Sequence, residues 1–240
     1  MKNKFGFILV KPQMGENIGA SARALKNFNF SNLIIVNPKQ GWPDIKTKAT
    51  SVGAYDIIKK AKVYSNVIDA INNFDIVFSL SSRKRDINKK HISINNFLKI
   101  ISIKKNLNYG FMFGPEASGL SNEDLSFSNY ILQIPTYKNF KSMNLSHSLT
   151  IVCYEIFKIL NSRKFKKIKN LKRIASKKSL NNLTIFLQRL LEEKNFFNPA
   201  EKKKSMMLNI NNIFSRLEIS SKEIRILSSI FGSLSKNKRP

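Results

Sequence analysis

Three short segments carry residues whose types and spacing suit a binding or catalytic site. The first is Gly15-Glu16-Asn17-Ile18-Gly19-Ala20-Ser21-Ala22-Arg23. Gly15 and Gly19 flank Asn17 and permit a tight turn into a helix that Asn17 can cap. Arg23 lies six positions beyond Asn17, close to two helical turns, so both side chains can point toward the same end of a sheet. A capped helix that carries one surface arginine explains this segment as well as a site does.

The second segment is Phe113-Gly114-Pro115-Glu116-Ala117-Ser118-Gly119-Leu120-Ser121. Two glycines, a proline and an acid directly after an apolar run indicate a rigid loop whose backbone approaches a ligand closely. An ordinary loop before a helix capped by Ser121 fits the same residues.

The third segment joins Ile134-Pro135 to Lys141-Ser142-Met143-Asn144-Leu145-Ser146. Ser142 and Asn144 offer hydrogen-bond donors and acceptors at the start of an expected helix. Capping of that helix by one of these two residues is the simpler explanation of this segment taken alone.

The elements that must position these segments form an α/β domain with a largely parallel sheet. Short apolar runs alternate with helical patterns over about the first 160 residues, which is typical of βα units. Ligands of such folds bind beyond the carboxyl ends of the strands. The expected strands are Phe5–Val10, Leu33–Val36, Lys62–Tyr64, Ile76–Leu80, Tyr109–Phe113 and Tyr130–Ile134, and the expected helical segments are Ile18–Phe28, Val67–Asn72, Ile92–Ile101, Asn122–Leu125 and Leu145–Leu160.

The residue composition changes after this domain, which we place at residues 1–160. Residues 158–178 contain ten Lys or Arg and no acid, so we expect a basic linker over 161–180, either a solvated connector or an RNA contact. Residues 181–240 predict three helices that pack as a small bundle. The first is Asn182–Phe196, the second has Pro199 at its first helical position, and the third begins with capping-box spacing at Ser220–Glu223.

The net charge of +27, from 42 Lys and Arg against 15 Asp and Glu, predicts a polyanionic partner. Nucleic acid is the usual one, and an anionic membrane surface is the alternative. The sequence contains no run of about 20 apolar residues, so we expect no membrane span. Cys153 is the only cysteine, which excludes an intramolecular disulfide, and neither it nor His91 and His147 suggests a metal site. We expect a cytoplasmic protein without a metal.

Each segment allows two explanations, whereas their order and spacing are specific. An N-x-G-x-x-x-R turn, an F-G-x-E-x-x-G-L loop and an I-P…S-x-N-L-S segment resemble the SPOUT class of RNA methyltransferases, and within it the TrmH-type enzymes that methylate ribose 2′-hydroxyls. The resemblance covers roughly residues 4–160, and Val52–Asp56 and Arg83–Arg85 add smaller matches. The C-terminal helical extension favours the enzymes that modify cytidine or uridine at nucleotide 32 of tRNA.

The resemblance implies a trefoil knot, in which the chain after Phe113 threads through an earlier loop. It also implies a homodimer whose active site is assembled across the subunit interface, and S-adenosylmethionine as the methyl donor. The implied cofactor pocket consists of Leu80, Ser81, Ser82, Gly114, Glu116, Ile134, Ser142, Met143 and Asn144.

The resemblance places Arg23 at the reacting hydroxyl, as a proton acceptor assisted by a phosphate or as a cation that orients phosphate and hydroxyl. Asn17 and Glu116 would position Arg23 or the ribose, and Ser142 and Asn144 would bind the cofactor and anchor the adjacent subunit's contribution. The expected RNA-binding residues are Arg23, Arg83, Arg85, Lys164, Lys166, Lys167, Lys169 and Lys172, with Lys177 and Lys178 as further phosphate contacts.

Two positions depart from the family's pattern, and two other functions stay open. Ala117 stands where many related sequences carry Arg, and Met143 replaces the more usual Leu.

The alternatives are methylation of another tRNA position or of ribosomal RNA, and a basic RNA-binding factor without catalysis. A measurement of S-adenosylmethionine binding distinguishes them, because an RNA-binding factor without catalysis should show no saturable affinity for this cofactor.

Overall fold

The structure is a computed structural model that describes residues 4–39, 41–82, 87–104, 106–161 and 174–235. In this part of the chain, seven strands form one parallel sheet in the order β3-β2-β1-β6-β4-β7-β5. The strands are β1 (Phe5–Val10), β2 (Leu33–Val36), β3 (Lys62–Tyr64), β4 (Ile76–Leu80), β5 (His91–Ser93), β6 (Tyr109–Phe113) and β7 (Tyr130–Gln133).

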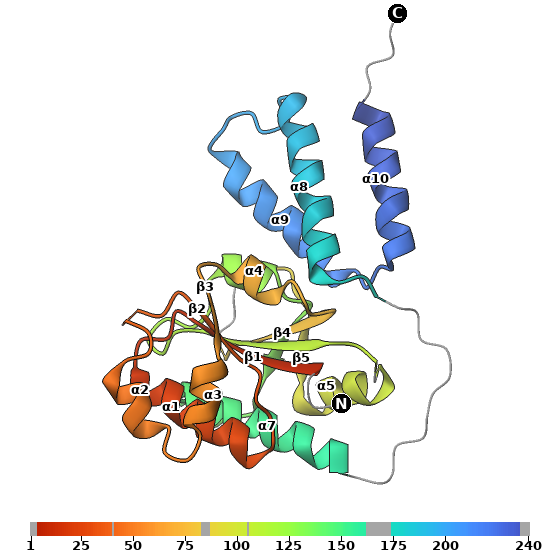
Figure 1. Ribbon diagram of the computed structural model, residues 1–240. Coiled ribbons are helices and arrows are strands. Elements are labelled where there is room, and N and C mark those ends of the chain that lie inside the picture. Colours follow the sequence, from red (N-terminus) through yellow and green to blue (C-terminus); the bar gives the residue numbers. More distant parts are fainter. Residues whose placement is uncertain (1–3, 40, 83–86, 105, 162–173, 236–240) are drawn as a thin grey trace, which may run out of the picture.

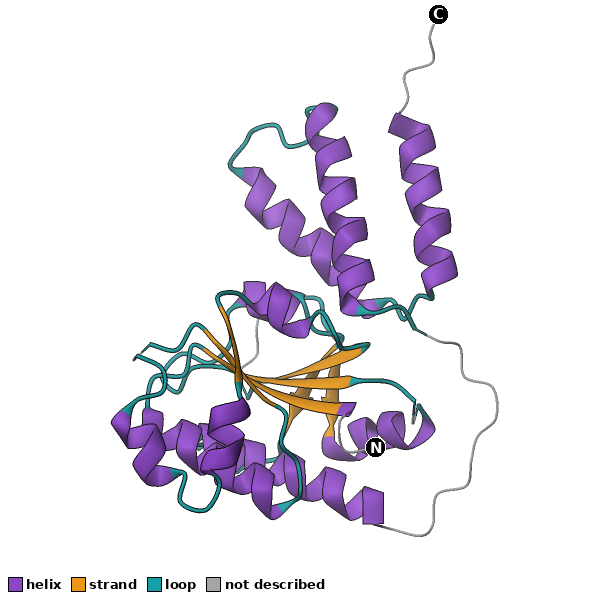
Figure 2. Cartoon of the chain, in the orientation of Figure 1, coloured by secondary structure: helices purple, strands orange, loops and turns teal. Residues whose placement is uncertain are grey.

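Helices cover both faces of the sheet, which explains why its central strands are apolar throughout. Along β1, Phe7 and Leu9 face one core cluster while Ile8 and Val10 face the other, because successive side chains alternate between faces. The first face packs against α1 (Gly15–Asn27), α3 (Tyr55–Lys60), α5 (Ile94–Ile103) and α7 (Leu145–Asn161), and the second against α4 (Val67–Ile71) and α6 (Asn122–Ser126). The parallel α/β architecture predicted from the sequence is confirmed (Figures 1 and 2).

Most differences from the predicted elements of the α/β domain lie in short segments, while α1 begins at Gly15, three residues before its predicted start. The sequence did not indicate α2 (Ile45–Thr50) or α3, each six residues long, and β7 ends at Gln133, one residue before the predicted end. The helical pattern at 92–101 divides into β5 and α5. Because β5 is a three-residue edge strand held only by its pairing with β7, no local periodicity reveals it.

Three helices follow the α/β domain: α8 (Lys177–Glu193), α9 (Lys202–Arg216) and α10 (Ser221–Ser235). Helix α10 begins with the predicted capping box, in which Ser220 Oγ accepts from the Glu223 N–H at 3.3 Å and Glu223 Oε2 accepts from the Ser220 N–H at 2.6 Å. The prediction for Pro199 is wrong, because α9 starts at Lys202 instead. Helix α8 packs against both α9 and α10 around Leu180, Leu183, Phe214 and Ile224.

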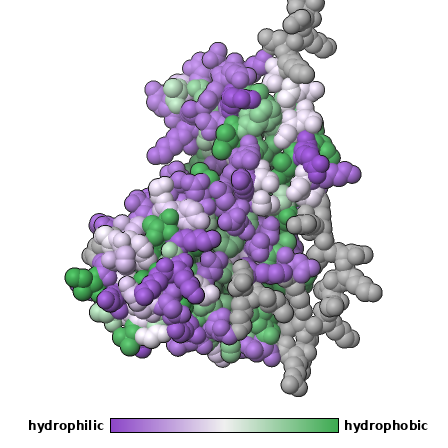
Figure 3. Space-filling model, viewed as in Figure 1, coloured by the Kyte–Doolittle hydropathy of each residue, from purple (hydrophilic) through white to green (hydrophobic). Residues whose placement is uncertain are grey.

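The C-terminal helices sit over α4 and α6, on the second face of the sheet (Figure 1). The Lys177 N–H donates to the carbonyl of Phe74 at 2.8 Å, and the Ser215 hydroxyl donates to the carbonyl of Ser126. Hydrophilic side chains cover most of the visible surface, with apolar atoms gathered between the C-terminal helices (Figure 3). None of the described helices is long and apolar enough to cross a membrane.

Two lysines are buried at this junction. Lys177 is 2 % exposed and its Nζ has no hydrogen-bond partner, so the prediction that it neutralises an RNA phosphate is wrong. Lys89 Nζ donates to the carbonyls of Ser126 at 2.9 Å and Ser128 at 2.6 Å. Loss of hydration lowers the pKa of Lys177 to about 7, and loss of hydration together with the charges of Lys177 and Arg216 lowers the pKa of Lys89 to about 6.

We expect the stability of the protein to rise with pH above neutrality because of these lysines. Between the lowered pKa of the folded state and the ordinary value of 10.5, the unfolded chain binds more protons than the folded one. In urea unfolding followed by circular dichroism, Lys177→Met should be more stable than wild type at pH 7. Its free energy of unfolding should also rise less steeply with pH than that of wild type. The two slopes should differ by up to about 1 kcal/mol per pH unit.

Lys178→Met is the matched control, because Lys178 is the exposed neighbour of Lys177 on the same helix. It should leave the pH dependence of unfolding unchanged. Identical pH slopes for wild type and both variants would contradict a buried Lys177 whose pKa is lowered.

Candidate functional site

A cavity of about 120 Å³ lies beyond the carboxyl ends of β4, β6 and β7. Eight of the nine residues predicted for the cofactor pocket line it: Leu80, Ser81, Ser82, Gly114, Glu116, Ile134, Ser142 and Met143. The remaining walls are Phe113, Pro115, Gly119, Leu132, Thr136, Lys141, Leu145 and Ser148. Parallel strands deliver all of their following loops to one edge, so segments far apart in the sequence meet there.

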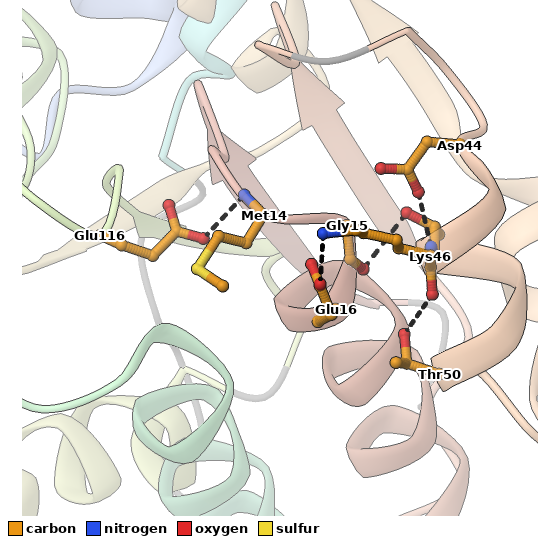
Figure 4. Close-up of polar contacts among 8 residues, drawn as sticks. Met14, Gly15, Glu16, Asp44, Lys46, Thr50 and Glu116 are labelled. Carbon is orange, nitrogen blue, oxygen red and sulfur yellow. Dashed lines mark hydrogen bonds and ion pairs between the residues drawn. The ribbon is translucent and has the colours of Figure 1, made fainter.

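Glu116 is the acceptor that ties the second segment to the first. Its Oε2 accepts from the Gln13 N–H at 2.9 Å. Its Oε1 accepts from the Met14 N–H at 3.3 Å, as Figure 4 shows, and from Asn17 Nδ2 at 2.7 Å. With both oxygens engaged, the carboxylate holds the start of α1 against the loop after β6.

Asn144 ties the third segment to the same network. Its Nδ2 donates to Asn17 Oδ1 at 2.9 Å, while its Oδ1 accepts from the Ser146 N–H at 2.8 Å and so caps α7. Asn144 therefore has the capping role that the simpler explanation assigned to it, and also contacts the first segment. It is the one residue of the predicted pocket that is not among the cavity walls described above.

Asn17 and its two neighbouring glycines act differently from the prediction. Helix α1 begins at Gly15, before Asn17, so Asn17 is not its N-cap but a buried cross-link between Glu116 and Asn144. The glycines do not form a turn. A Cβ on Gly19 would lie 2.1 Å from Thr50 Oγ1 and 2.8 Å from the Thr47 carbonyl, so glycine is needed for α2 to pack against α1.

Helix α2 is held against the start of α1 by polar contacts (Figure 4). Thr47 Oγ1 donates to the Gly15 carbonyl at 3.2 Å, and Lys46 Nζ lies 3.0 Å from Glu16 Oε1. The Asp44 carboxylate accepts from the Thr47 N–H and caps α2. These contacts fix the helix that carries both Asn17 and Arg23.

Glycines also shape the loop after β6. A Cβ on Gly114 would lie 2.2 Å from the Leu120 backbone nitrogen, and Gly119 has a φ of +68°, a conformation that side chains disfavour. The Gly119 N–H donates to the Pro115 carbonyl at 2.8 Å and closes the loop. Ser121 caps α6 in a capping box with Asp124, so the second segment is both a cavity wall and a helix start.

The structure does not bring Arg23 to the cavity. Arg23 is exposed on α1, and six residues of helix place it about 9 Å along the axis from Asn17. Because α1 runs back from the carboxyl edge of the sheet, Arg23 lies further from that edge than Asn17, and a shared orientation of the two side chains stays a prediction. Arg83, Arg85, Lys164, Lys166, Lys167, Lys169 and Lys172 lie outside the described residues.

Sequence reasoning missed several residues at the site. Thr136 follows the first half of the third segment, Lys141 begins its second half, and Ser148 is one helical turn beyond Asn144, so continuity and helical spacing could have indicated them. Gln13, whose Oε1 accepts from the Ala117 N–H at 3.3 Å, carries no comparable signal. Among the described residues, no group of three or more His, Cys, Asp or Glu could hold a metal ion.

Residues 4–154 match the SpoU rRNA Methylase family, and the chain belongs to this family. The protein is thus an RNA methyltransferase of the S-adenosylmethionine-dependent type, as its resemblance to TrmH-type enzymes implied. The cavity suits such a donor, because it joins apolar walls for a base to hydroxyl and backbone groups for the polar parts.

The particular relatives are enzymes named TrmJ. The tRNA (cytidine-2′-O-)-methyltransferase TrmJ of Methanocaldococcus jannaschii is 34 % identical over 93 % of this chain and 96 % of its own length. The tRNA (cytidine/uridine/adenosine-2′-O-)-methyltransferase TrmJ of Pseudomonas aeruginosa is 27 % identical over 96 % of this chain and 93 % of its own. The crystal structure of TrmJ from Z. mobilis ZM4 superposes with a TM-score of 0.87 at 27 % identity, covering 96 % of this chain and 99 % of the other.

We expect Glu116→Gln to weaken the binding of S-adenosylmethionine at least tenfold in calorimetry. The amide keeps only one acceptor oxygen, which leaves a backbone N–H of Gln13 or Met14 without its partner and loosens the cavity wall. Glu123→Gln, an exposed change on α6, is the control and should bind normally. Normal affinity of Glu116→Gln would show that the network does not shape the pocket.

We expect Gly19→Ala to lower the free energy of unfolding by about 2 kcal/mol or more. The added methyl group meets the Thr47 carbonyl, a backbone atom that cannot rotate away. Gly41→Ala is the control, since nothing lies within 4 Å of its Cβ position. Urea unfolding measures both, and equal midpoints would contradict the close packing of α1 and α2.

Proposed function

We propose that this protein transfers the methyl group of S-adenosylmethionine to a ribose 2′-hydroxyl of tRNA, at cytidine or uridine 32 of the anticodon loop. The observation that carries the proposal is the hydrogen-bond chain Glu116–Asn17–Asn144, which joins three family segments beside one cavity. The relatives named for tRNA 2′-O-methylation, matched over nearly the whole chain, support the choice of substrate.

The bound cofactor would supply the activated methyl group, and the residues of this chain would bind and align. Leu80, Ile134 and Met143 offer apolar contact, and the hydroxyls of Ser81, Ser82 and Ser142 offer hydrogen bonds. Glu116 is engaged by three donors, so its role is to hold the loop rather than to accept a proton from the ribose. Alignment of donor and acceptor supplies much of the acceleration of such a displacement.

Arg23 is the residue that we assign to the reacting hydroxyl, and its exposed position away from the cavity favours a site shared by two copies. In the proposed homodimer, Arg23 of one subunit completes the cavity of the other. A guanidinium keeps its proton at neutral pH, so Arg23 either orients phosphate and hydroxyl as a cation or accepts a proton only with help from the phosphate. We also propose the trefoil knot of the SPOUT class.

The remaining assignments follow the same proposal. Residues 1–160 form the catalytic domain, 161–180 the basic linker and 181–240 the helical extension, although α8 already begins at Lys177. The lysines of the linker neutralise tRNA phosphates without reading sequence. The protein acts in the cytoplasm, where tRNA is modified.

A different target is the second candidate. The family is described as one of rRNA methylases, so another tRNA position or ribosomal RNA is the alternative substrate. A factor that binds RNA without catalysis fits less well, because the hydrogen-bonded network around Asn17 is complete.

The proposal is tested by methyl transfer from labelled S-adenosylmethionine to unmodified tRNA, with nucleoside mapping. We expect a 2′-O-methyl nucleotide at position 32 with wild type, and a loss of at least about 100-fold in Arg23→Ala. Lys26→Ala, an exposed change one turn further along α1, should retain activity. Modification elsewhere would favour the second candidate, and no transfer to any RNA would contradict catalysis.

Mixed dimers test whether the site is shared. If Arg23→Ala and Glu116→Gln are each inactive, an equal mixture after subunit exchange contains about one half mixed dimers, each with one intact site. We therefore expect about a quarter of wild-type activity to return. No recovery despite exchange would place Arg23 and the cavity in the same subunit.

A further inference from the structure

A tight turn stands on the rim of the cavity, between β7 and α7. The Phe140 N–H donates to the carbonyl of Tyr137 at 3.0 Å, which closes a four-residue turn. The residues on either side of the turn, Thr136 and Lys141, are both walls of the cavity. The turn therefore borders the cavity.

The turn presents two aromatic rings to solvent. Tyr137 is 67 % exposed and Phe140 is 73 % exposed, whereas the large rings of the sheet, such as Phe78 and Phe111, are fully buried. The Tyr137 hydroxyl accepts a hydrogen bond from Asn139 Nδ2 at 3.2 Å. Because exposed aromatic surface is unfavourable in water, two such rings beside a ligand cavity indicate a binding surface.

The sequence around the rings is basic. Lys138 lies within the turn and Lys141 follows it, both exposed, and no Asp or Glu occurs from Leu125 to Tyr154. Aromatic rings interleaved with lysines suit unpaired nucleic acid, whose bases stack on rings while its phosphates pair with the cations.

We propose that Tyr137 and Phe140 form a stacking platform for unpaired bases of the RNA next to the nucleotide that is methylated. The inference rests on the proposed function, since it names the part of the RNA substrate that the cavity rim receives. The lysines contribute affinity for phosphate, and the rings hold splayed bases so that the target ribose reaches the cavity.

The test uses the full-length protein and an anticodon stem-loop RNA that carries 2-aminopurine at successive loop positions. Tyr137→Ala and Phe140→Ala should each weaken RNA binding about tenfold in fluorescence anisotropy. They should also abolish the quenching of 2-aminopurine at one or two loop positions. Tyr137→Phe and Phe140→Tyr should restore both signals, because any aromatic ring stacks.

Three controls separate this role from others. Ile45→Ala, which removes a side chain that is 87 % exposed on α2, should leave RNA binding unchanged. The affinity for S-adenosylmethionine, measured by calorimetry, and the molecular mass, measured by light scattering, should match wild type in both alanine variants.

Three outcomes would overturn the platform. They are unchanged RNA affinity in the alanine variants, an equal loss of cofactor affinity, and a change of oligomeric state, which would place the rings against a second copy. If wild type methylates tRNA and the alanine variants bind it normally, the platform fails while the proposed function stands. If wild type methylates no RNA but stem-loop binding depends on the rings, the proposed function fails instead.

Discussion

The amide of Asn17 is the contact on which the rest of the site depends. Its Nδ2 donates to Glu116 and its Oδ1 accepts from Asn144, so one buried side chain joins the loops that follow β6 and β7 to the helix that follows β1. Neither neighbour is free to move, because Glu116 also holds two backbone N–H groups and Asn144 also caps α7. A buried network of this kind fixes a geometry only when all of its members are satisfied.

The same constraint explains the packing around α1. Helix α2 must lie close enough for Thr47 to reach the Gly15 carbonyl, which leaves no room for a side chain at Gly19. On the opposite face of the sheet, the C-terminal helices dock through backbone carbonyls and bury Lys89 and Lys177. The two faces therefore differ: one holds the helix of the site rigidly, and the other carries a junction that is sensitive to protonation.

Much of the fold was predictable because the strands of a parallel sheet with helices on both faces appear in the sequence as short apolar runs. Six of the seven strands were expected at or within one residue of their observed bounds. The missed elements, β5, α2 and α3, are short, and their existence depends on partners distant in the sequence. The predicted start of α9 at Pro199 failed for a related reason, since helix-start residues are also common in turns.

The sequence by itself determined the chemistry: the residue types of three segments, their order, and an excess of positive charge suited to nucleic acid. The resemblance to a known family also indicated half of the cavity walls, since eight of the nine residues that it implied line the cavity. Only the tertiary structure decided how they act, with Asn17 as a cross-link rather than a cap, Arg23 away from the cavity and Lys177 buried. The reason is physical: spacing along the chain specifies local conformation, whereas burial and hydrogen-bond partners are set by packing between segments about 100 residues apart.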